Sequence, residues 1–67
     1  MKLQINGAEM EIPKTIKNIT QLIDHLKLNS PVIIVEHNDV ILPKEDLDDA
    51  MLTAGDKVEF VQFVGGG

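Results

Sequence analysis

The sequence predicts an α+β fold in which one helix packs against a mixed sheet of about five strands. Strand-like patterns stand at both ends of the chain and in its middle, whereas only one segment has the period of a helix. A single apolar helical stripe needs a sheet face to cover it, and 67 residues are enough for one core only. We therefore expect the first and last strands to lie side by side in the middle of the sheet.

The composition excludes several classes of function. With 43% hydrophobic and 25% charged residues, the chain has the composition of a globular domain. The net charge of -5 and the absence of arginine argue against nucleic-acid binding, and the absence of cysteine excludes disulfides and cysteine chemistry. No apolar run approaches the roughly 20 residues of a membrane span, and no signal peptide is recognisable. We expect a cytoplasmic protein without membrane contact.

The first predicted element is a β-hairpin. Apolar and polar residues alternate over residues 2–5 and 10–12, on either side of Asn6-Gly7. Both residues of this dipeptide tolerate a positive φ, so they suit a type I′ turn.

A helix is predicted over residues 18–28. Its apolar residues follow the spacing i, i+3, i+4 and i+7, which forms one stripe: Ile19, Leu22, Ile23 and Leu26. Asn18 is placed to cap the helix, and Gln21 is placed to return the reciprocal bond of a capping box. Lys27 suits the last turn, and residues 29–31, Asn-Ser-Pro, are expected to end the helix.

The second half of the chain predicts three more strands. Residues 32–35 are continuous and β-branched, which indicates a strand covered on both faces, and the run breaks at Asn38-Asp39. Residues 40–42 form a short return strand. Residues 43–49 are acidic and irregular, with room for one helical turn, and residues 54–56 make a turn before the final strand.

The final strand, residues 57–63, has apolar residues on both of its faces. Val58 and Phe60 share one face, and Val61 and Phe63 share the other. One face meets the helix. The other is either covered by the loop of residues 43–53 or forms a docking patch for a partner, made of Val61, Phe63 and Val64.

After this strand the chain ends in three glycines, Gly65 to Gly67. Glycine has no Cβ, so the tail is the thinnest chain available, and residues 64–67 reach about 13 Å when extended. The terminal carboxylate becomes an acyl donor only after activation, for example as an acyl-adenylate made from ATP. The sequence has no phosphate-binding G-x-x-x-x-G-K-[ST] motif and no obvious nucleophile and base pair. We predict a domain over 1–63, a flexible tail over 64–67, and a substrate of a partner enzyme rather than an enzyme; the alternative is a frayed end without function.

Together these features resemble the ThiS family of sulfur carriers in thiamin biosynthesis. The resemblance covers the whole chain and is carried by the hairpin, the helix, V-E-H-N at 35–38, G-D-K-V-E at 55–59 and F-V-G-G-G at 63–67. It implies the β-grasp, ubiquitin-like fold, with the first and last strands parallel at the centre of the sheet.

The resemblance also implies a chemistry. In that family an E1-like, ATP-dependent enzyme (ThiF) adenylates the C-terminal glycine, which here is Gly67. The acyl-adenylate becomes a thiocarboxylate with sulfur from a sulfur-donor enzyme, and thiazole synthase (ThiG) uses that sulfur. Gly65 and Gly66 would thread into the partner's active site. The domain itself would bind no cofactor and no metal, because ATP belongs to the activating enzyme.

Two alternatives remain open from the sequence. A carrier of the MoaD type for molybdopterin synthesis would share the fold and the activation, although its usual Pro-Pro lead to the glycines is absent here. A β-grasp interaction module would bind a partner through Val61 and Phe63 and would not use the glycines.

Other polar residues are expected to lie on a solvated surface. His25 falls on the polar side of the helical stripe and His37 beside a turn, so neither is assigned a catalytic or metal-binding role. The acidic residues of 45–49 lack the spacing of a calcium loop, which would require glycine where Met51 stands.

Overall fold

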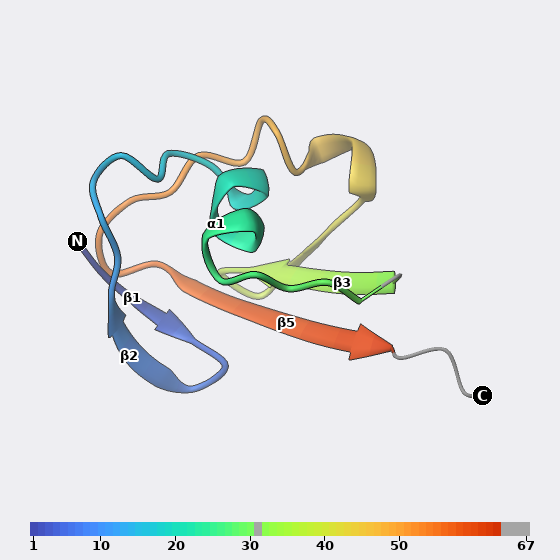
Figure 1. Ribbon diagram of the computed structural model, residues 1–67, viewed down its shortest axis with the longest axis horizontal. Helices are drawn as coiled ribbons and strands as arrows, with labels where there is room; N and C mark the ends of the chain where they lie inside the picture. Colours follow the sequence, from blue (N-terminus) through green and yellow to red (C-terminus); the bar gives the residue numbers. More distant parts are fainter. Residues whose placement is uncertain (31, 64–67) are drawn as a thin grey trace.

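A computed structural model of the chain describes residues 1–30 and 32–63. Its five strands form one mixed sheet in the order β2-β1-β5-β3-β4, with one α-helix on one face (Figure 1). The predicted α+β fold is confirmed. The elements are β1 (Lys2–Ile5), β2 (Ala8–Glu11), α1 (Ile19–His25), β3 (Val32–His37), β4 (Val40–Leu42), a short 3₁₀ helix η1 (Lys44–Asp46) and β5 (Lys57–Phe63).

The centre of the sheet joins the two ends of the chain, as predicted. β1 and β2 form an antiparallel hairpin whose turn places Asn6 at φ 50° and Gly7 at φ 83°. Both values are positive, as the type I′ turn requires. β1 then pairs in parallel with β5, and β5 pairs antiparallel with β3. The final strand is therefore central.

The start of α1 follows the predicted cap with one difference. The Asn18 side chain accepts a hydrogen bond from the Gln21 N–H at 2.8 Å. The Gln21 Oε1 atom accepts from the Lys17 N–H at 2.6 Å, so the return bond reaches the residue before the cap. In both cases a side-chain oxygen satisfies an N–H at the helix start that has no partner in the helix.

The end of α1 comes earlier than the sequence pattern predicted. The helix stops at His25, and Lys27 adopts φ 57°, in the left-handed region. The Lys27 N–H donates to the Asp24 carbonyl at 3.1 Å, and the Leu28 N–H donates to the Ile23 carbonyl at 3.2 Å. This closure satisfies the last helical carbonyls, so Lys27 ends the helix and residues 29–30 follow it.

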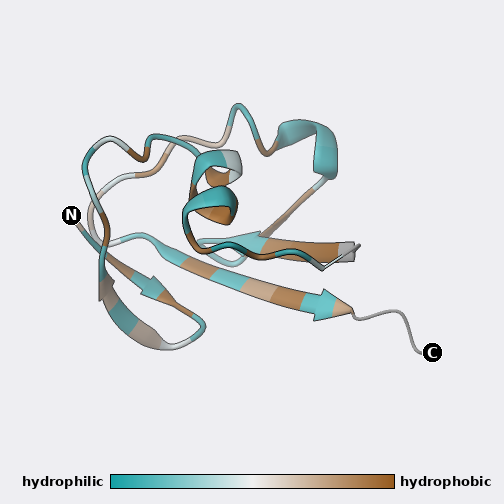
Figure 2. Cartoon of the chain, viewed as in Figure 1, coloured by the Kyte–Doolittle hydropathy of each residue, from teal (hydrophilic) through white to brown (hydrophobic). Residues whose placement is uncertain are grey.

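The core lies between α1 and one face of the sheet. Figure 2 shows the hydrophobic side of the helix turned toward the strands and its hydrophilic side turned away. Eight hydrophobic side chains are buried there: Leu3, Ile5, Ile12, Ile19, Leu22, Val35, Val58 and Phe60. The predicted stripe of the helix contributes Ile19 and Leu22 to this set, while Ile23 and Leu26 pack partly buried at its border.

The opposite face of the sheet is open, which makes one prediction wrong. Residues 32–35 were expected to be covered on both faces, but Val35 is buried while Ile34, on the other face of β3, is 39% exposed. The reason is that a single helix covers only one face of the sheet. Within this run, Val35 therefore faces the core and Ile34 faces the open side of the sheet.

Candidate functional site

The candidate site is the last part of β5 together with the tail that follows it. Val58 and Phe60 point into the core, and Phe60 is only 6% exposed. The side chains of Val61 and Phe63 are 45% and 50% exposed, because both lie on the open face of the sheet. The interpretation in which the loop of residues 43–53 covers them is therefore wrong.

An apolar patch surrounds these two side chains. In the register of the sheet, Val61 of β5 lies opposite Ile34 of β3, and Ile41 of β4 projects on the same face. All of them are at least 39% exposed. We call this set the open-face patch: Ile34, Ile41, Val61 and Phe63. The patch includes Val61 and Phe63 at the end of the last described strand, and its exposed apolar side chains are free to contact another protein.

The start of β5, in contrast, is held by a polar cluster around Asp56. The His37 Nε2 atom lies 2.7 Å from the Asp56 Oδ2 atom. The same carboxylate accepts from the Thr53 N–H at 2.9 Å and from the Asn38 side-chain amide at 3.2 Å. Burial raises the pKa of Asp56, but the hydrogen bonds from His37, Thr53 and Asn38 outweigh it and hold the pKa below its ordinary value. Asp56 is thus an ionised acceptor at neutral pH.

This cluster corrects the interpretation of His37 as a solvated residue. Its side chain is only 16% exposed, and it joins β3 to the turn before β5. Because an ionised carboxylate can only accept, the His37 Nε2 atom carries the hydrogen. The sequence signal for this cluster was Asp56 in the G-D-K-V-E motif. Its partner, His37, lies 19 residues earlier, and only the fold brings the two together.

Further contacts fix the same end of the strand. The Lys57 Nζ atom lies 2.6 Å from the Asp39 carboxylate, and the hydrogen bond and charge of Asp39 raise the pKa of Lys57. The Lys57 N–H donates to the Asn38 Oδ1 atom at 2.9 Å. The β3–β4 turn is therefore tied to the beginning of β5 through both side chains and backbone.

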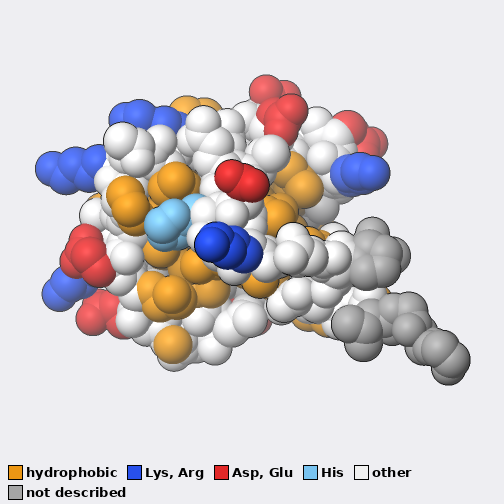
Figure 3. All heavy atoms as spheres, viewed as in Figure 1, with side chains coloured by type: hydrophobic (Ala, Val, Ile, Leu, Met, Phe, Trp, Pro, Cys, Tyr) orange, Lys and Arg blue, Asp and Glu red, His pale blue; other side chains and the backbone are white. Residues whose placement is uncertain are grey.

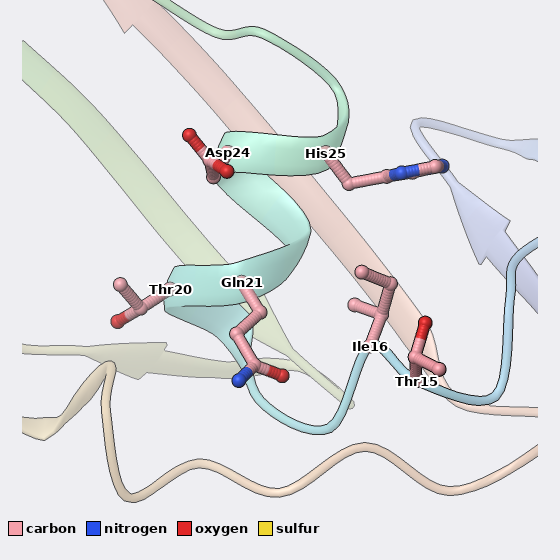
Figure 4. Close-up of a pocket in the computed structure, with 6 residues that line it drawn as sticks. All are labelled: Thr15, Ile16, Thr20, Gln21, Asp24 and His25. Atoms are coloured by element: carbon pink, nitrogen blue, oxygen red, sulfur yellow. The ribbon is translucent and has the colours of Figure 1, made fainter.

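The other surface features offer less chemistry. His25 is exposed on α1, as predicted, at the rim of a shallow hollow between the helix and the loop before it (Figure 4). In that view the side chains of Thr20 and Asp24 project from one side of the helix and that of His25 from the opposite side. The Gln21 side chain projects toward the loop before the helix. Acidic side chains gather over η1 in Figure 3. The acidic residues predicted to lie on a solvated surface are all exposed: Glu45, Asp46, Asp48 and Asp49.

The glycines themselves lie outside the described residues, as does Val64 of the predicted docking patch. Within residues 1–30 and 32–63, no group of three or more histidine or carboxylate side chains is arranged to hold a metal ion. None of the helices in that part of the chain has the length and apolar character needed to cross a membrane.

Comparison with known proteins places the chain in one protein family. A sequence model described as the ThiS family matches residues 3–67. The crystal structure of the thiamine biosynthesis protein ThiS from Geobacter metallireducens superposes with a TM-score of 0.85 at 35% identity, and the match covers both chains completely. An NMR structure of a Geobacter metallireducens thiamine biosynthesis protein gives a TM-score of 0.82 and is covered over 88% of its length.

Relatives found by sequence fall into two groups. The protein ycf40 of Trieres chinensis is 36% identical over 63 residues, which is 94% of this chain and 85% of that protein. A thiazole synthase of Paramagnetospirillum magneticum is 37% identical over all 67 residues, but these span only 20% of its length. The larger protein therefore contains a segment similar to this whole chain.

Proposed function

The chain belongs to the ThiS family, and from this membership we propose that it is the sulfur carrier of thiazole formation in thiamin biosynthesis. The observation that carries the proposal is the family match over residues 3–67, which includes the glycine tail. We further propose that residues 1–63 are the folded carrier domain and that residues 64–67 are the flexible arm that delivers the terminal carboxylate.

The proposed chemistry takes place at Gly67. A carboxylate oxygen of Gly67 attacks the α-phosphorus of ATP in the active site of an E1-like enzyme of the ThiF type, and pyrophosphate leaves. A sulfur nucleophile from a sulfur-donor enzyme then attacks the acyl carbon of the adenylate, and AMP leaves. Where that nucleophile is the outer sulfur of a persulfide, the product is an acyl disulfide; a thiol then attacks the donor's sulfur, the S–S bond breaks, the thiol leaves as a disulfide with the donor, and the thiocarboxylate remains on Gly67. Activation is necessary because an ionised carboxylate repels nucleophiles.

The carrier supplies the acyl group, and the partner supplies the catalytic groups. The sequence contains no arginine and no phosphate-binding loop, which are the usual means of stabilising a transferring phosphoryl group. Gly65 and Gly66 in the proposed arm would enter a narrow channel, because glycine has no side chain to clash with its walls.

The open-face patch is the proposed docking surface for the activating enzyme. Val61 and Phe63 lie half exposed on the strand that leads into the arm, and Val64, the third residue predicted for the patch, lies outside the described residues. From Phe63 the arm reaches only about 13 Å, so an enzyme that acts on Gly67 must lie close to this patch.

Thiazole synthase is the proposed acceptor of the sulfur. A protein named thiazole synthase contains a segment similar to this whole chain, over 20% of its length. Two activities joined in one polypeptide are held at high effective concentration, which favours components of the same reaction. This observation also favours thiazole formation over the molybdopterin pathway.

The test is intact mass spectrometry with fragmentation of the C-terminus. The chain is incubated with ATP, the E1-like enzyme and a sulfur source, and we expect an adenylate followed by replacement of oxygen by sulfur at Gly67. As a control, a variant with one alanine appended after Gly67 should fold and bind the enzyme but remain unmodified at position 67.

An unmodified Gly67, beside a second ThiS-family carrier that is modified in the same assay, would contradict the carrier proposal. Equal partner binding by the extended and the unextended chain, with neither of them modified, would instead support an interaction module.

A further inference from the structure

The last residues of β5 have a free edge on the side away from β3. β1 runs beside β5 only at the pairs Gln4–Lys57 and Ile5–Val58, whereas β5 continues to Phe63. Among the described residues, no other strand pairs with β5 on that side. Figure 1 shows the arrowhead of β5 extending past the β1–β2 hairpin. The sheet is therefore incomplete at the point where the tail begins.

The hydrogen bonds identify which backbone groups face this edge. On the β1 side, the Val58 carbonyl accepts from the Asn6 N–H at 3.0 Å, and the Phe60 N–H donates to the Asn6 Oδ1 atom at 2.8 Å. On the β3 side, the Lys57 carbonyl accepts from the Asn38 N–H at 2.8 Å. Because the direction alternates along a strand, Gln62 is the next residue whose N–H and C=O face away from β3.

Asn6 closes the paired part of this edge. Its backbone makes the hairpin turn, and its side chain takes the place of one further residue of β1 by accepting from Phe60. Beyond that contact, the described part of the chain offers no partner for the backbone of Gln62 on this side.

The edge also lacks the features that usually prevent strand addition. Residues 61–63 contain no lysine, no proline and no charge, and all three are exposed. The outer strand β2, in contrast, carries Glu9 and Glu11. An exposed and unguarded edge of this kind accepts an extended segment of another chain through main-chain hydrogen bonds.

The length of the tail indicates which protein supplies the segment that pairs with this edge. Only four residues separate Phe63 from the terminal carboxylate, a reach of about 13 Å. An enzyme whose active site receives Gly67 must therefore lie against this end of β5, where it also meets Val61 and Phe63 on the open face.

We propose that an extended segment of the activating enzyme adds to the sheet as a strand beside the end of β5 and hydrogen bonds to the N–H and C=O of Gln62. This pairing fixes the direction and register of the strand that continues into the tail. The inference rests on the proposed carrier function and adds to it how the partner holds the carrier.

The test compares two substitutions at one position. Gln62→Pro removes the N–H that faces the free edge, where proline is tolerated in a sheet. Gln62→Ala keeps that N–H and loses the same side chain, with its hydrogen bond from Ser30, so it is the matched control. By isothermal titration calorimetry with the E1-like enzyme, we expect Gln62→Pro to raise Kd roughly three- to tenfold, the value of one hydrogen bond, and Gln62→Ala to leave it unchanged.

A second variant guards against misfolding of the proline chain. Chemical ligation can replace the amide between Val61 and Gln62 by an ester, which deletes the same N–H without restricting φ. The ester chain should show the same weakening of Kd, with thermal unfolding measured for each variant.

The outcomes separate this inference from the carrier function. Wild-type affinity in the folded proline and ester chains would overturn strand addition, even if Gly67 is still modified. A wild-type chain that binds the enzyme but stays unmodified would overturn the carrier function. The Kd values of the Gln62 variants would still show whether the enzyme adds a strand at this edge. Wild-type dimers that Gln62→Pro abolishes, with no change in enzyme affinity, would assign the edge to a second copy and overturn the proposal.

Discussion

The two ends of β5 are held in different ways. At its start, Asp56 and Lys57 are joined to the β3–β4 turn by side-chain hydrogen bonds and an ion pair, and β1 and β3 flank the strand on both sides. At its end, Val61 and Phe63 stand exposed, and within residues 1–30 and 32–63 only β3 pairs with the strand. The fixed start positions the strand, and the open end leaves apolar side chains and backbone groups free for a partner.

The largest expected effect comes from the buried part of the strand. Phe60→Ala should destabilise the domain by about 3–5 kcal/mol, because it leaves a cavity among Leu22, Val35 and their neighbours in the core. The total stability of a chain of this length is roughly 3–10 kcal/mol, so the variant should be partly unfolded at room temperature. Urea unfolding followed by circular dichroism measures the change. A loss below about 1 kcal/mol would mean that Phe60 does not hold β5 to the core.

Breaking the polar cluster at the start of β5 should have the next largest effect. Asp56→Asn places an amide N–H₂ where three donors converge, and we expect a loss of roughly 1–3 kcal/mol at pH 7. Since the folded pKa of Asp56 lies below its ordinary value of 3.8, this stability is present above pH 3.8 and is lost as the pH falls through the folded pKa.

Urea unfolding of both proteins at pH 7, 5, 3 and 2 tests this sign. The difference between wild type and Asp56→Asn should shrink as the pH falls below 3.8. A difference that grows between pH 3 and pH 2 would contradict the role given to the ionised carboxylate.

Substitution at the open end should affect binding and leave the fold intact. Phe63→Ser removes an exposed side chain, so the free energy of unfolding should change by no more than about 0.5 kcal/mol. Affinity for the E1-like enzyme should fall about tenfold if Phe63 contacts it. Titration calorimetry measures this, and Phe63→Leu, which keeps an apolar side chain, is the control. An unchanged Kd for Phe63→Ser would remove Phe63 from the docking surface.

The smallest effect is expected for the contact that joins the end of β5 to the segment after α1. The Ser30 hydroxyl donates to the Gln62 Oε1 atom at 2.7 Å, and both side chains lie on the surface. Gln62→Ala should therefore cost less than about 0.5 kcal/mol in the free energy of unfolding. A larger loss in urea unfolding would show that this end of the strand is held more firmly than the comparison indicates.

Local patterns in the sequence determined most of the fold. Asn6-Gly7 predicted the turn of the hairpin, the spacing of Ile19 and Leu22 predicted the helix, and alternation predicted the two faces of β5. These signals act over a few residues, so the sequence contains them in full. The predicted end of α1 was too late because Lys27, before the Asn-Ser-Pro segment, adopts the left-handed conformation. Lysine rarely adopts this conformation, so its presence in the sequence does not predict a helix end.

The candidate site depended more on tertiary structure. The sequence placed Val61 and Phe63 on one face of β5, but only the sheet and its single helix decided that this face is open. The contacts of Asp56 with His37 and of Asn6 with Phe60 span 19 and 54 residues, and no local pattern specifies them. The sequence by itself determined the elements and the glycine tail; which surfaces stay uncovered was decided by the order of strands and the different lengths of β1 and β5, because burial depends on what the whole chain brings together.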